Sequence, residues 1–147
     1  MITDKGDFHS SAPIVGPEKK IVLIRDKRKG TPLWKFAGGK KQILKPPSKK
    51  LRGETPLEAL LRELKEETGL TVTRSQTQYV TSERMTNHNK HYFLCHVNSF
   101  RKLEPLSREY EETKIFSIED LKWLTDFHPS YREIFFRHML PLIDEWK

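Results

Sequence analysis

The stretch "TPLEALLRELKEETGL", residues 55–70, predicts the best-defined helix of the chain. Thr55 is a favourable N-cap, a proline follows at the first helical position, and Glu58 completes a T-x-x-E capping box. Four leucines have the i, i+3, i+4, i+7 spacing of a single apolar face: Leu57, Leu60, Leu61 and Leu64. Gly69 suits the position just past a helix C-terminus. We therefore predict a helix over residues 56–68 that packs its leucine face against a core.

Strands are predicted on both sides of this helix. Before it, "KKIVLIRDK" (19–27) is a short apolar run between charges, and "LWKF" (33–36) leads to the pair Gly38 and Gly39, which we expect to end or bend the strand. Further elements are predicted after it: strands within 70–83, 91–100 and 114–117, a helical turn at 118–124, and a terminal helix over 129–146 with a capping box at Ser130–Glu133. This order indicates a mixed α/β layer arrangement.

The composition fits one domain over residues 1–147, whose first twelve residues we expect to be flexible. The longest aliphatic run, "IVLI" at 21–24, is far too short to cross a membrane, and the N-terminus lacks the apolar segment of a secretory signal. A single cysteine, Cys95, cannot form an internal disulfide and is expected in the core. These features predict a cytoplasmic protein without a membrane partner.

The net charge of +7 is unevenly distributed along the chain. Residues 1–52 hold 14 Lys and Arg against 4 Asp and Glu, a balance of +10, whereas residues 53–147 hold 13 against 16, a balance of −3. The basic part is expected to attract anions: phosphorylated small molecules, nucleic acids or acidic membranes. Charge alone does not choose among them.

Three glutamates near the end of the predicted helix, Glu63, Glu66 and Glu67, lie at i, i+3 and i+4 and so within reach of one another. Like charges at this spacing repel, and they also face the negative end of the helix dipole. For such a pattern taken alone, a solvated helix surface is the more common explanation and a metal site is the alternative. A metal site would favour Mg²⁺ or Ca²⁺, which prefer hard oxygen ligands.

The segment "GETPLEALLRELKEETGL", residues 53–70, resembles the Nudix box, G-x5-E-x7-R-E-U-x-E-E-x-G-U with U aliphatic. Eight of its nine defined positions match: Glu54, Arg62, Glu63, Leu64, Glu66, Glu67, Gly69 and Leu70. Ser48 stands where the box begins with glycine, and the "GGK" that usually leads into the box occurs earlier, at residues 38–40. Residues 41–52 are therefore predicted to be an inserted basic loop, either a clamp on substrate phosphates or a tolerated surface bulge.

The resemblance implies an α/β/α sandwich around a mixed β-sheet, and a metal-dependent hydrolase that cleaves the pyrophosphate linkage of a nucleoside diphosphate derivative. The alternative is a Nudix-fold module that binds nucleotide or RNA without turning it over. The implied cofactor is Mg²⁺, with Mn²⁺ as a substitute. The implied metal ligands are Glu63, Glu66, Glu67 and the Gly38 carbonyl. Glu63 is alternatively the general base, while Arg62 orients the carboxylates and Glu54 is its partner.

The family often adds an acid from a later loop. The candidates are Glu109, Glu111 and Glu112, of which Glu112 is favoured. Substrate-binding candidates are Arg25, Trp34, Phe36 and Lys40, together with Tyr92, His88 and His91. The aromatic residues can stack a base but are more often part of a core. The expected partner is a phosphorylated, nucleotide-type small molecule or an RNA 5′ end, and the sequence does not select one.

Overall fold

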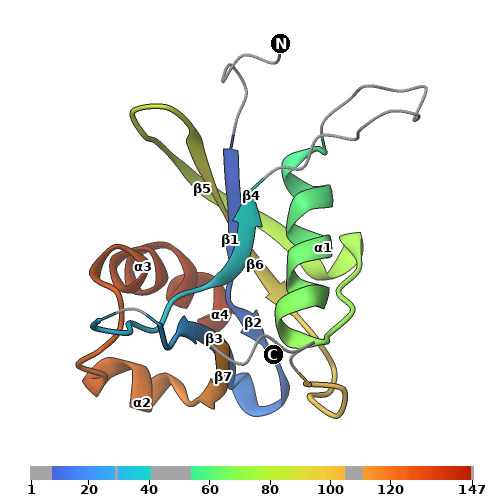
Figure 1. The fold of residues 1–147 in the computed structure, drawn as a ribbon. Helices are drawn as coiled ribbons and strands as arrows, with labels where there is room; N and C mark the ends of the chain where they lie inside the picture. The colour runs from blue at the N-terminus through green and yellow to red at the C-terminus, as the bar shows by residue number, and fades with distance from the viewer. Residues whose placement is uncertain (1–7, 29, 41–53, 105–110, 147) are drawn as a thin grey trace.

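The computed structural model describes residues 8–28, 30–40, 54–104 and 111–146, which form a mixed β-sheet covered by helices on both faces (Figure 1). The strands are β1 (Phe8–Ala12), β2 (Ile14–Val15), β3 (Ile21–Asp26), β4 (Ala37–Lys40), β5 (Thr77–Arg84), β6 (Asn89–His96) and β7 (Glu111–Phe116). Their order is β4-β1-β6-β2-β3-β7, and β5 pairs with the other edge of β6. The predicted mixed sheet is confirmed.

The sheet divides into two branches at β6. Both β1 and β2 run parallel to β6 along the same edge, β1 on its first half and β2 on its second half. Pro13 separates the two strands and has no N–H to donate to a ladder. One branch continues from β1 to β4, and the other continues from β2 through β3 to β7. The strands β4 and β7 therefore end two separate branches that both start from β6.

Helices close both faces of the sheet, as expected for an α/β/α sandwich (Figure 1). One face carries α1 (Pro56–Thr68), whose Leu60 and Leu64 pack in one core cluster with Ile24 and Phe93. The other face carries α2 (Ile118–Trp123), α3 (Pro129–Ile134), a π-helical turn (Phe135–Met139) and α4 (Leu140–Asp144). Short 3-10 turns occur at Pro17–Lys19 and Arg74–Gln76. Among the described residues, no helix is long and apolar enough to span a bilayer.

The helix α1 has the predicted bounds and caps. The Thr55 hydroxyl accepts from the Glu58 N–H at 3.1 Å, and the Glu58 carboxylate accepts from the Thr55 N–H at 2.9 Å. Gly69 has a φ of 78°, a left-handed conformation that glycine adopts without strain. Cys95 is buried, as predicted. The carboxylates of α1 are consequently carried by a helix fixed at both ends.

The terminal helix begins one residue earlier than its predicted cap. His128 is the N-cap, and its Nδ1 accepts from the Ser130 N–H at 3.2 Å, so the predicted capping box at Ser130–Glu133 is wrong. The π-helical turn follows, and the Leu140 N–H donates to the Phe135 carbonyl, five residues earlier. The next residue, Pro141, has no N–H to continue an α-helical ladder, which accounts for the irregular turn.

Three strand predictions need correction. Gly38 and Gly39 do not end a strand but lie inside β4, because α1 and β1 approach this strand too closely for side chains. Residues 70–76 are not extended in a ladder, and β5 begins only at residue 77, after a 3-10 turn with its own capping box. Residues 8–12 are not a flexible end, since they form the interior strand β1 between β4 and β6. The inserted loop at 41–52 lies outside the described residues.

Candidate functional site

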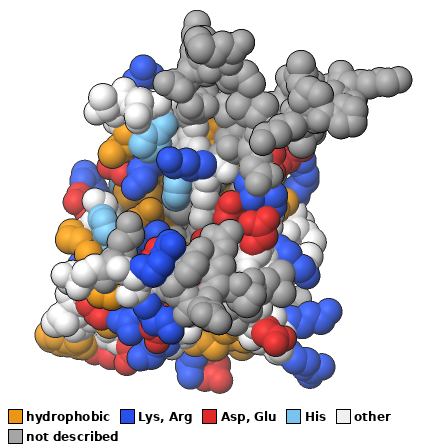
Figure 2. Space-filling model, in the orientation of Figure 1, with side chains coloured by type: hydrophobic (Ala, Val, Ile, Leu, Met, Phe, Trp, Pro, Cys, Tyr) orange, Lys and Arg blue, Asp and Glu red, His pale blue; other side chains and the backbone are white. Residues whose placement is uncertain are grey.

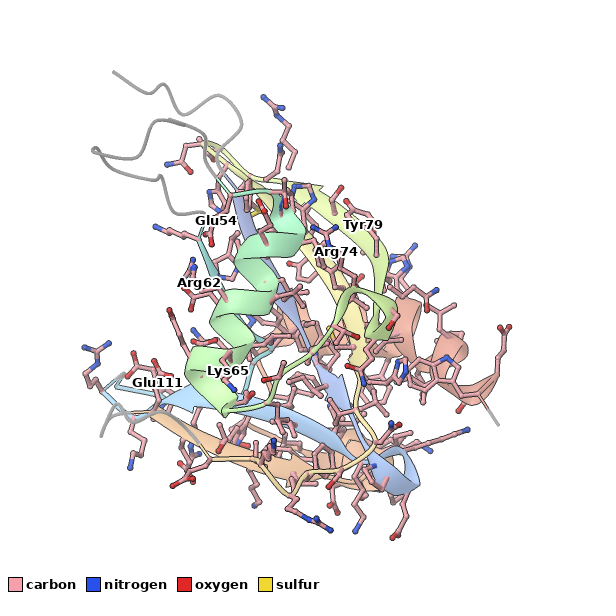
Figure 3. All side chains as sticks on the ribbon, turned by 90° about the vertical axis from the view of Figure 1, so that its right-hand side faces the viewer. Glu54, Arg62, Lys65, Arg74, Tyr79 and Glu111 are labelled. Atoms are coloured by element: carbon pink, nitrogen blue, oxygen red, sulfur yellow. The ribbon has the colours of Figure 1, made fainter. Side chains whose placement is uncertain are left out.

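Arg62 is the centre of a group of acidic side chains on α1. Its Nε and Nη2 donate to the two carboxylate oxygens of Glu54 at 2.8 and 2.9 Å, a bidentate pair. Its Nη1 donates to Glu63 Oε1 at 2.7 Å and lies 3.3 Å from Glu66 Oε2. These hydrogen bonds, that of Glu54 above all, raise the pKa of the Arg62 guanidinium. We call Glu54, Arg62, Glu63, Glu66 and Glu67 the acid cluster, of which Glu54 and Arg62 are labelled in Figure 3.

The glycines of β4 allow the acid cluster to lie against the sheet. A Cβ atom on Gly39 would come within 2.4 Å of Glu63 Cδ, and a Cβ atom on Gly38 would come within 2.0 Å of the Ser10 carbonyl oxygen. The Gly38 N–H donates to Glu67 Oε1 at 2.7 Å, and Arg62 Nη2 donates to the Lys40 carbonyl at 3.1 Å. The strand therefore positions α1 and three of its polar side chains together.

Glu67 is the most buried of these carboxylates, with 8% of the residue exposed. Burial raises its pKa to about 8, and the negative charges of Glu111 and Glu63 act in the same direction. The Gly38 N–H and the positive charge of Lys35 oppose the shift. A buried carboxylate with two acidic neighbours is stabilised in its ionised form by a nearby cation, so this is the position in the acid cluster with the greatest demand for one.

The later acid that lies near the acid cluster is Glu111. Cross-strand pairing sets Glu111 opposite Asp26 and Glu112 opposite Arg25, so the two glutamates point to opposite faces of the sheet. Glu112 is paired with Arg25 at 2.7 Å, whereas the charge of Glu111 acts on Glu67. Figure 3 shows Glu111 beside the C-terminal half of α1. Adjacent strand residues alternate between faces, so Glu111 rather than the preferred Glu112 is the described candidate that acts on Glu67, and the role of either glutamate stays a prediction; Glu109 lies outside the described residues.

The predicted substrate-stacking residues are part of the core. Trp34, Phe36 and Tyr92 are each at most 2% exposed. Arg25 lies 4.5 Å above the ring of Trp34 and is held by Glu112 and by Asp126 at 3.3 Å. None of these four offers an open face to a base in this structure. The alternation of these aromatic residues with polar ones indicated a strand but did not reveal which face another layer would cover.

The remaining predicted residues lie at the surface or near it. Lys40 is exposed, and its backbone carbonyl contacts Arg62. The Lys40 side chain is accessible to a substrate, and its role in substrate binding stays a prediction. His91 Nδ1 lies 3.0 Å from the Tyr79 hydroxyl, and His88 Nδ1 lies 2.8 Å from Asn87 Oδ1. Both histidines therefore have local partners in the β5–β6 hairpin.

A pocket of about 310 Å³ lies between the end of β3, the segment before β4, the start of β6 and the start of α3. Its lining comes from four separate segments: Asp26, Thr31, Leu33, Lys35, Lys90, His128 and Tyr131. We call Lys35, Lys90, His128 and Tyr131 the basic pocket. The basic pocket lies within electrostatic range of the acid cluster. The charge of Lys35 lowers the pKa of Glu67, and the charge of Glu67 raises the pKa of Tyr131. In Figure 2 an acidic patch appears where α1 and β4 meet, and Lys, Arg and His side chains lie to its left.

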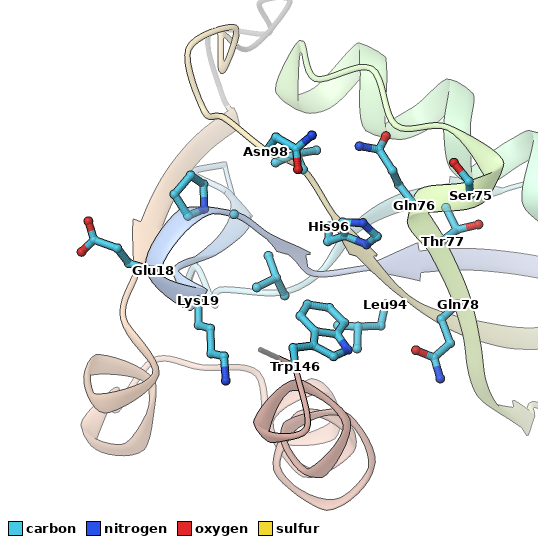
Figure 4. A pocket seen from close by; sticks show the side chains of 14 residues that line it. Glu18, Lys19, Ser75, Gln76, Thr77, Gln78, Leu94, His96, Asn98 and Trp146 are labelled. Atoms are coloured by element: carbon cyan, nitrogen blue, oxygen red, sulfur yellow. The ribbon is translucent and has the colours of Figure 1, made fainter.

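The larger cavity, of about 960 Å³, lies elsewhere, between the end of β6, the start of β5 and the end of the chain (Figure 4). Its lining includes Lys19, Gln78, Leu94, His96 and Trp146, and Glu18 is its sole carboxylate. None of the predicted site residues lines it. Size alone does not identify an active site, and the acid cluster has the carboxylates that the predicted chemistry needs. We therefore place the candidate active site at the acid cluster and the basic pocket.

The acid cluster suits a hard divalent cation, which prefers oxygen ligands. Glu63 and Glu66 each direct an oxygen toward Arg62 Nη1, so they already converge on one cationic position. Within the described ranges, no three His, Cys, Asp or Glu side chains are close enough to form a metal site by themselves. Mg²⁺ keeps several waters and shares other positions with substrate phosphates, so a partial set of protein ligands fits this ion.

Comparison with known proteins identifies the family. The NUDIX domain model matches residues 9–138, so the chain belongs to the Nudix family, as its box predicted. Membership supports a hydrolase of the pyrophosphatase type. No curated protein is similar enough in sequence to count as a relative.

Solved structures share the fold. MutT from Methanosarcina mazei Go1 is 20% identical over 95% of each chain, with a TM-score of 0.64. A NUDIX family hydrolase from Clostridium perfringens is 22% identical over 88% of this chain and 92% of its own, with a TM-score of 0.65. The MutT NUDIX hydrolase from Burkholderia pseudomallei is 22% identical over 86% and 93%, with a TM-score of 0.62. At these identities the likeness establishes the α/β/α fold and nothing finer.

Proposed function

We propose that the protein is a metal-dependent pyrophosphohydrolase that cleaves the diphosphate linkage of a nucleoside diphosphate derivative. The observation that carries the proposal is the acid cluster, in which one arginine holds three carboxylates beside a buried fourth, Glu67. A merely solvated helix surface would not hold these charges against a strand. Family membership supports the same reaction type.

The proposed reaction is attack of a water oxygen on phosphorus, with cleavage of the P–O bond to the bridging oxygen. Glu66 and Glu67, with Glu63 and the Gly38 carbonyl, would hold Mg²⁺ or Mn²⁺. When bound, the ion would neutralise phosphate charge and lower the pKa of a water molecule. Glu63 or Glu111 accepts the proton of the attacking water, and the leaving phosphate departs with the bridging oxygen. Arg62 is a positioning residue that orients Glu54, Glu63 and Glu66.

The second candidate is a module that binds nucleotide or RNA without hydrolysis. The basic pocket supports it, because lysines attract phosphates whether or not cleavage follows. Binding alone, however, does not require Glu67 to be buried beside Glu63 and Glu111, an arrangement that costs stability unless a cation is bound. The hydrolase is therefore the proposal that explains more of the site.

A substrate screen with a paired set of variants tests the proposal. Nucleoside triphosphates, ADP-ribose, sugar nucleotides, dinucleoside polyphosphates and RNA 5′ ends are incubated with Mg²⁺ or Mn²⁺, and phosphate is measured with and without a coupling phosphatase. The double variant Glu66→Gln, Glu67→Gln is expected to lose about 1,000-fold in kcat, since metal assistance contributes several kcal/mol.

The matched control is Glu119→Gln, Glu133→Gln, which makes the same change of charge at two exposed glutamates of α2 and α3. It should keep wild-type turnover. Equal turnover in both double variants, or folded wild-type protein that binds nucleotide and hydrolyses no substrate in the screen, would favour the binding module.

A further inference from the structure

In the basic pocket, Lys35 and Lys90 hold positive charge without a direct ion pair, and the carboxylate that lines the same pocket, Asp26, is paired with Arg28 at 2.9 Å. Among the described residues, no carboxylate oxygen lies within 4.0 Å of Lys35 Nζ or Lys90 Nζ. The two lysines act on each other, and burial together with Lys35 lowers the pKa of Lys90, while Glu83 opposes this. A third nitrogen base, His128, joins them, and both lysines lower its pKa in addition to burial. Like charges gathered in one pocket are stabilised when an anion binds between them.

A buried histidine extends this unsatisfied region along β1. His9 pairs with Lys40 of β4 on one side and with Lys90 of β6 on the other. Its Nδ1 is buried and has no hydrogen-bond partner in the described part of the chain. Burial, then the charges of Lys90 and Lys35, lower its pKa to about 4, so its ring is neutral at pH 7. The positive field here comes from the lysines around His9, namely Lys90, Lys35 and Lys40, and it reaches β1.

The aromatic surface of the pocket is already in use. Tyr131 is its one aromatic side chain among the lining residues, and Lys90 Nζ lies 4.9 Å from the centre of that ring. The rings of Phe36 and His128 also pack against Tyr131, at 4.9 and 5.1 Å between centroids. Tyr131 is 5% exposed, so its ring has little free surface on which a nucleobase could stack. Lysine and imidazole nitrogens, in contrast, match the oxygens of a phosphoryl group.

We propose that the basic pocket binds a phosphoryl group of the substrate rather than its base, so that the substrate carries phosphate beyond the diphosphate that is cleaved. This inference rests on the proposed function, because it places the cleaved bond at the acid cluster. The substrates it favours are polyphosphorylated: dinucleoside polyphosphates, or sugar and nucleoside diphosphates with a further phosphate ester.

Binding of inorganic tripolyphosphate without metal tests the pocket separately from hydrolysis. Isothermal titration in EDTA compares the wild type with the double variant Lys35→Gln, Lys90→Gln, which keeps side-chain length. The dissociation constant should rise by about tenfold or more, because two charge-assisted contacts are lost. Adenosine, which lacks phosphate, should not compete. The control Lys20→Gln, Lys102→Gln removes the same charge at two exposed lysines and should bind as the wild type does.

Two results would overturn the inference: wild-type affinity in the Lys35, Lys90 variant, or an equal loss in the control variant, which would indicate a general charge effect. If the double variant fails to fold, the single variants Lys35→Gln and Lys90→Gln are titrated instead. The Glu66→Gln, Glu67→Gln variant should still bind tripolyphosphate. A wild type that binds tripolyphosphate through these lysines and hydrolyses no substrate would refute the proposed function and leave the anion site standing.

Discussion

The acid cluster and the basic pocket adjoin each other, yet they are supported in different ways. The acid cluster comes from one helix and the residue two positions before it, and its side chains are fixed by hydrogen bonds to Arg62, Gly38 and the Lys40 carbonyl. The basic pocket comes from three segments, and the lysines in it have no ion pair with a described carboxylate. Catalytic groups need fixed positions, whereas groups that select a ligand can adopt their final conformation when it binds. The difference suggests a division between these two tasks.

The strongest test of this difference lies in the glycines beneath the acid cluster. Gly39→Ala places a Cβ atom against the Glu63 side chain, which can move, so the protein should fold while hydrolysis falls about 100-fold from the displaced carboxylate. Gly38→Ala meets the Ser10 backbone, which cannot move, and should lower the free energy of unfolding by about 3 kcal/mol or more.

Gly30→Ala is the matched control for this pair, because a Cβ atom there meets nothing within 4 Å. Urea unfolding and steady-state kinetics on the three variants separate the two effects. Full activity in Gly39→Ala would show that the acid cluster is as adaptable as the basic pocket.

The dependence of stability on pH should have opposite signs at Glu67, in the acid cluster, and at His9, which pairs with Lys90 of the basic pocket. Without metal, the pKa of Glu67 is about 8 in the folded state and near 4.5 when unfolded. Its contribution to the free energy of unfolding is therefore lost as pH rises from about 4.5 to about 8. His9 titrates near pH 4 when folded and near 6.5 when unfolded, so its contribution is lost as pH falls from about 6.5 to about 4.

Thermal unfolding in EDTA across pH 4 to 9 measures both slopes. Glu67→Gln should remove the loss on the alkaline side, on the order of 3 kcal/mol, and His9→Gln should reduce the loss on the acidic side. A Glu67→Gln curve parallel to the wild type throughout would mean that this carboxylate is not buried as described.

The smallest effect expected comes from the two neighbouring glutamates of β7. Glu112→Gln breaks a half-exposed ion pair with Arg25, which keeps Asp126, so the cost should be below about 1 kcal/mol and turnover should be unchanged. Glu111→Gln should instead reduce kcat, because Glu111 acts on Glu67. Kinetics and urea unfolding on both variants check the assignment. A larger loss of kcat in Glu112→Gln would restore the preference based on the sequence alone.

The sequence predicted the features that depend on neighbouring residues and could not predict those that depend on distant segments packing together. The bounds of α1, its caps and the spacing of the acid cluster are contained in residues 54–69, so periodicity and capping rules were sufficient. Lys35, Lys90 and His128 are far apart in the chain and resemble ordinary surface residues in the sequence, and only the fold brings the segment before β4, β6 and α3 together around one pocket. The choice between Glu111 and Glu112 depended on the register of β3 with β7, which a single sequence does not specify.

The segment before β4 links the two regions mechanically. The Trp34 N–H donates to the Asp126 carbonyl at 2.8 Å, and the His128 N–H donates to the Trp34 carbonyl at 2.9 Å, which ties the start of α3 to the strand segment that continues into Gly38. Lys35 is likewise bonded to Ile24 of β3 in both directions, at 2.9 and 2.8 Å. The spacing between His128 and the carboxylate that Gly38 holds is thus set by backbone. If the basic pocket holds a phosphoryl group as proposed, this spacing would select for the number of phosphates between that group and the cleaved linkage.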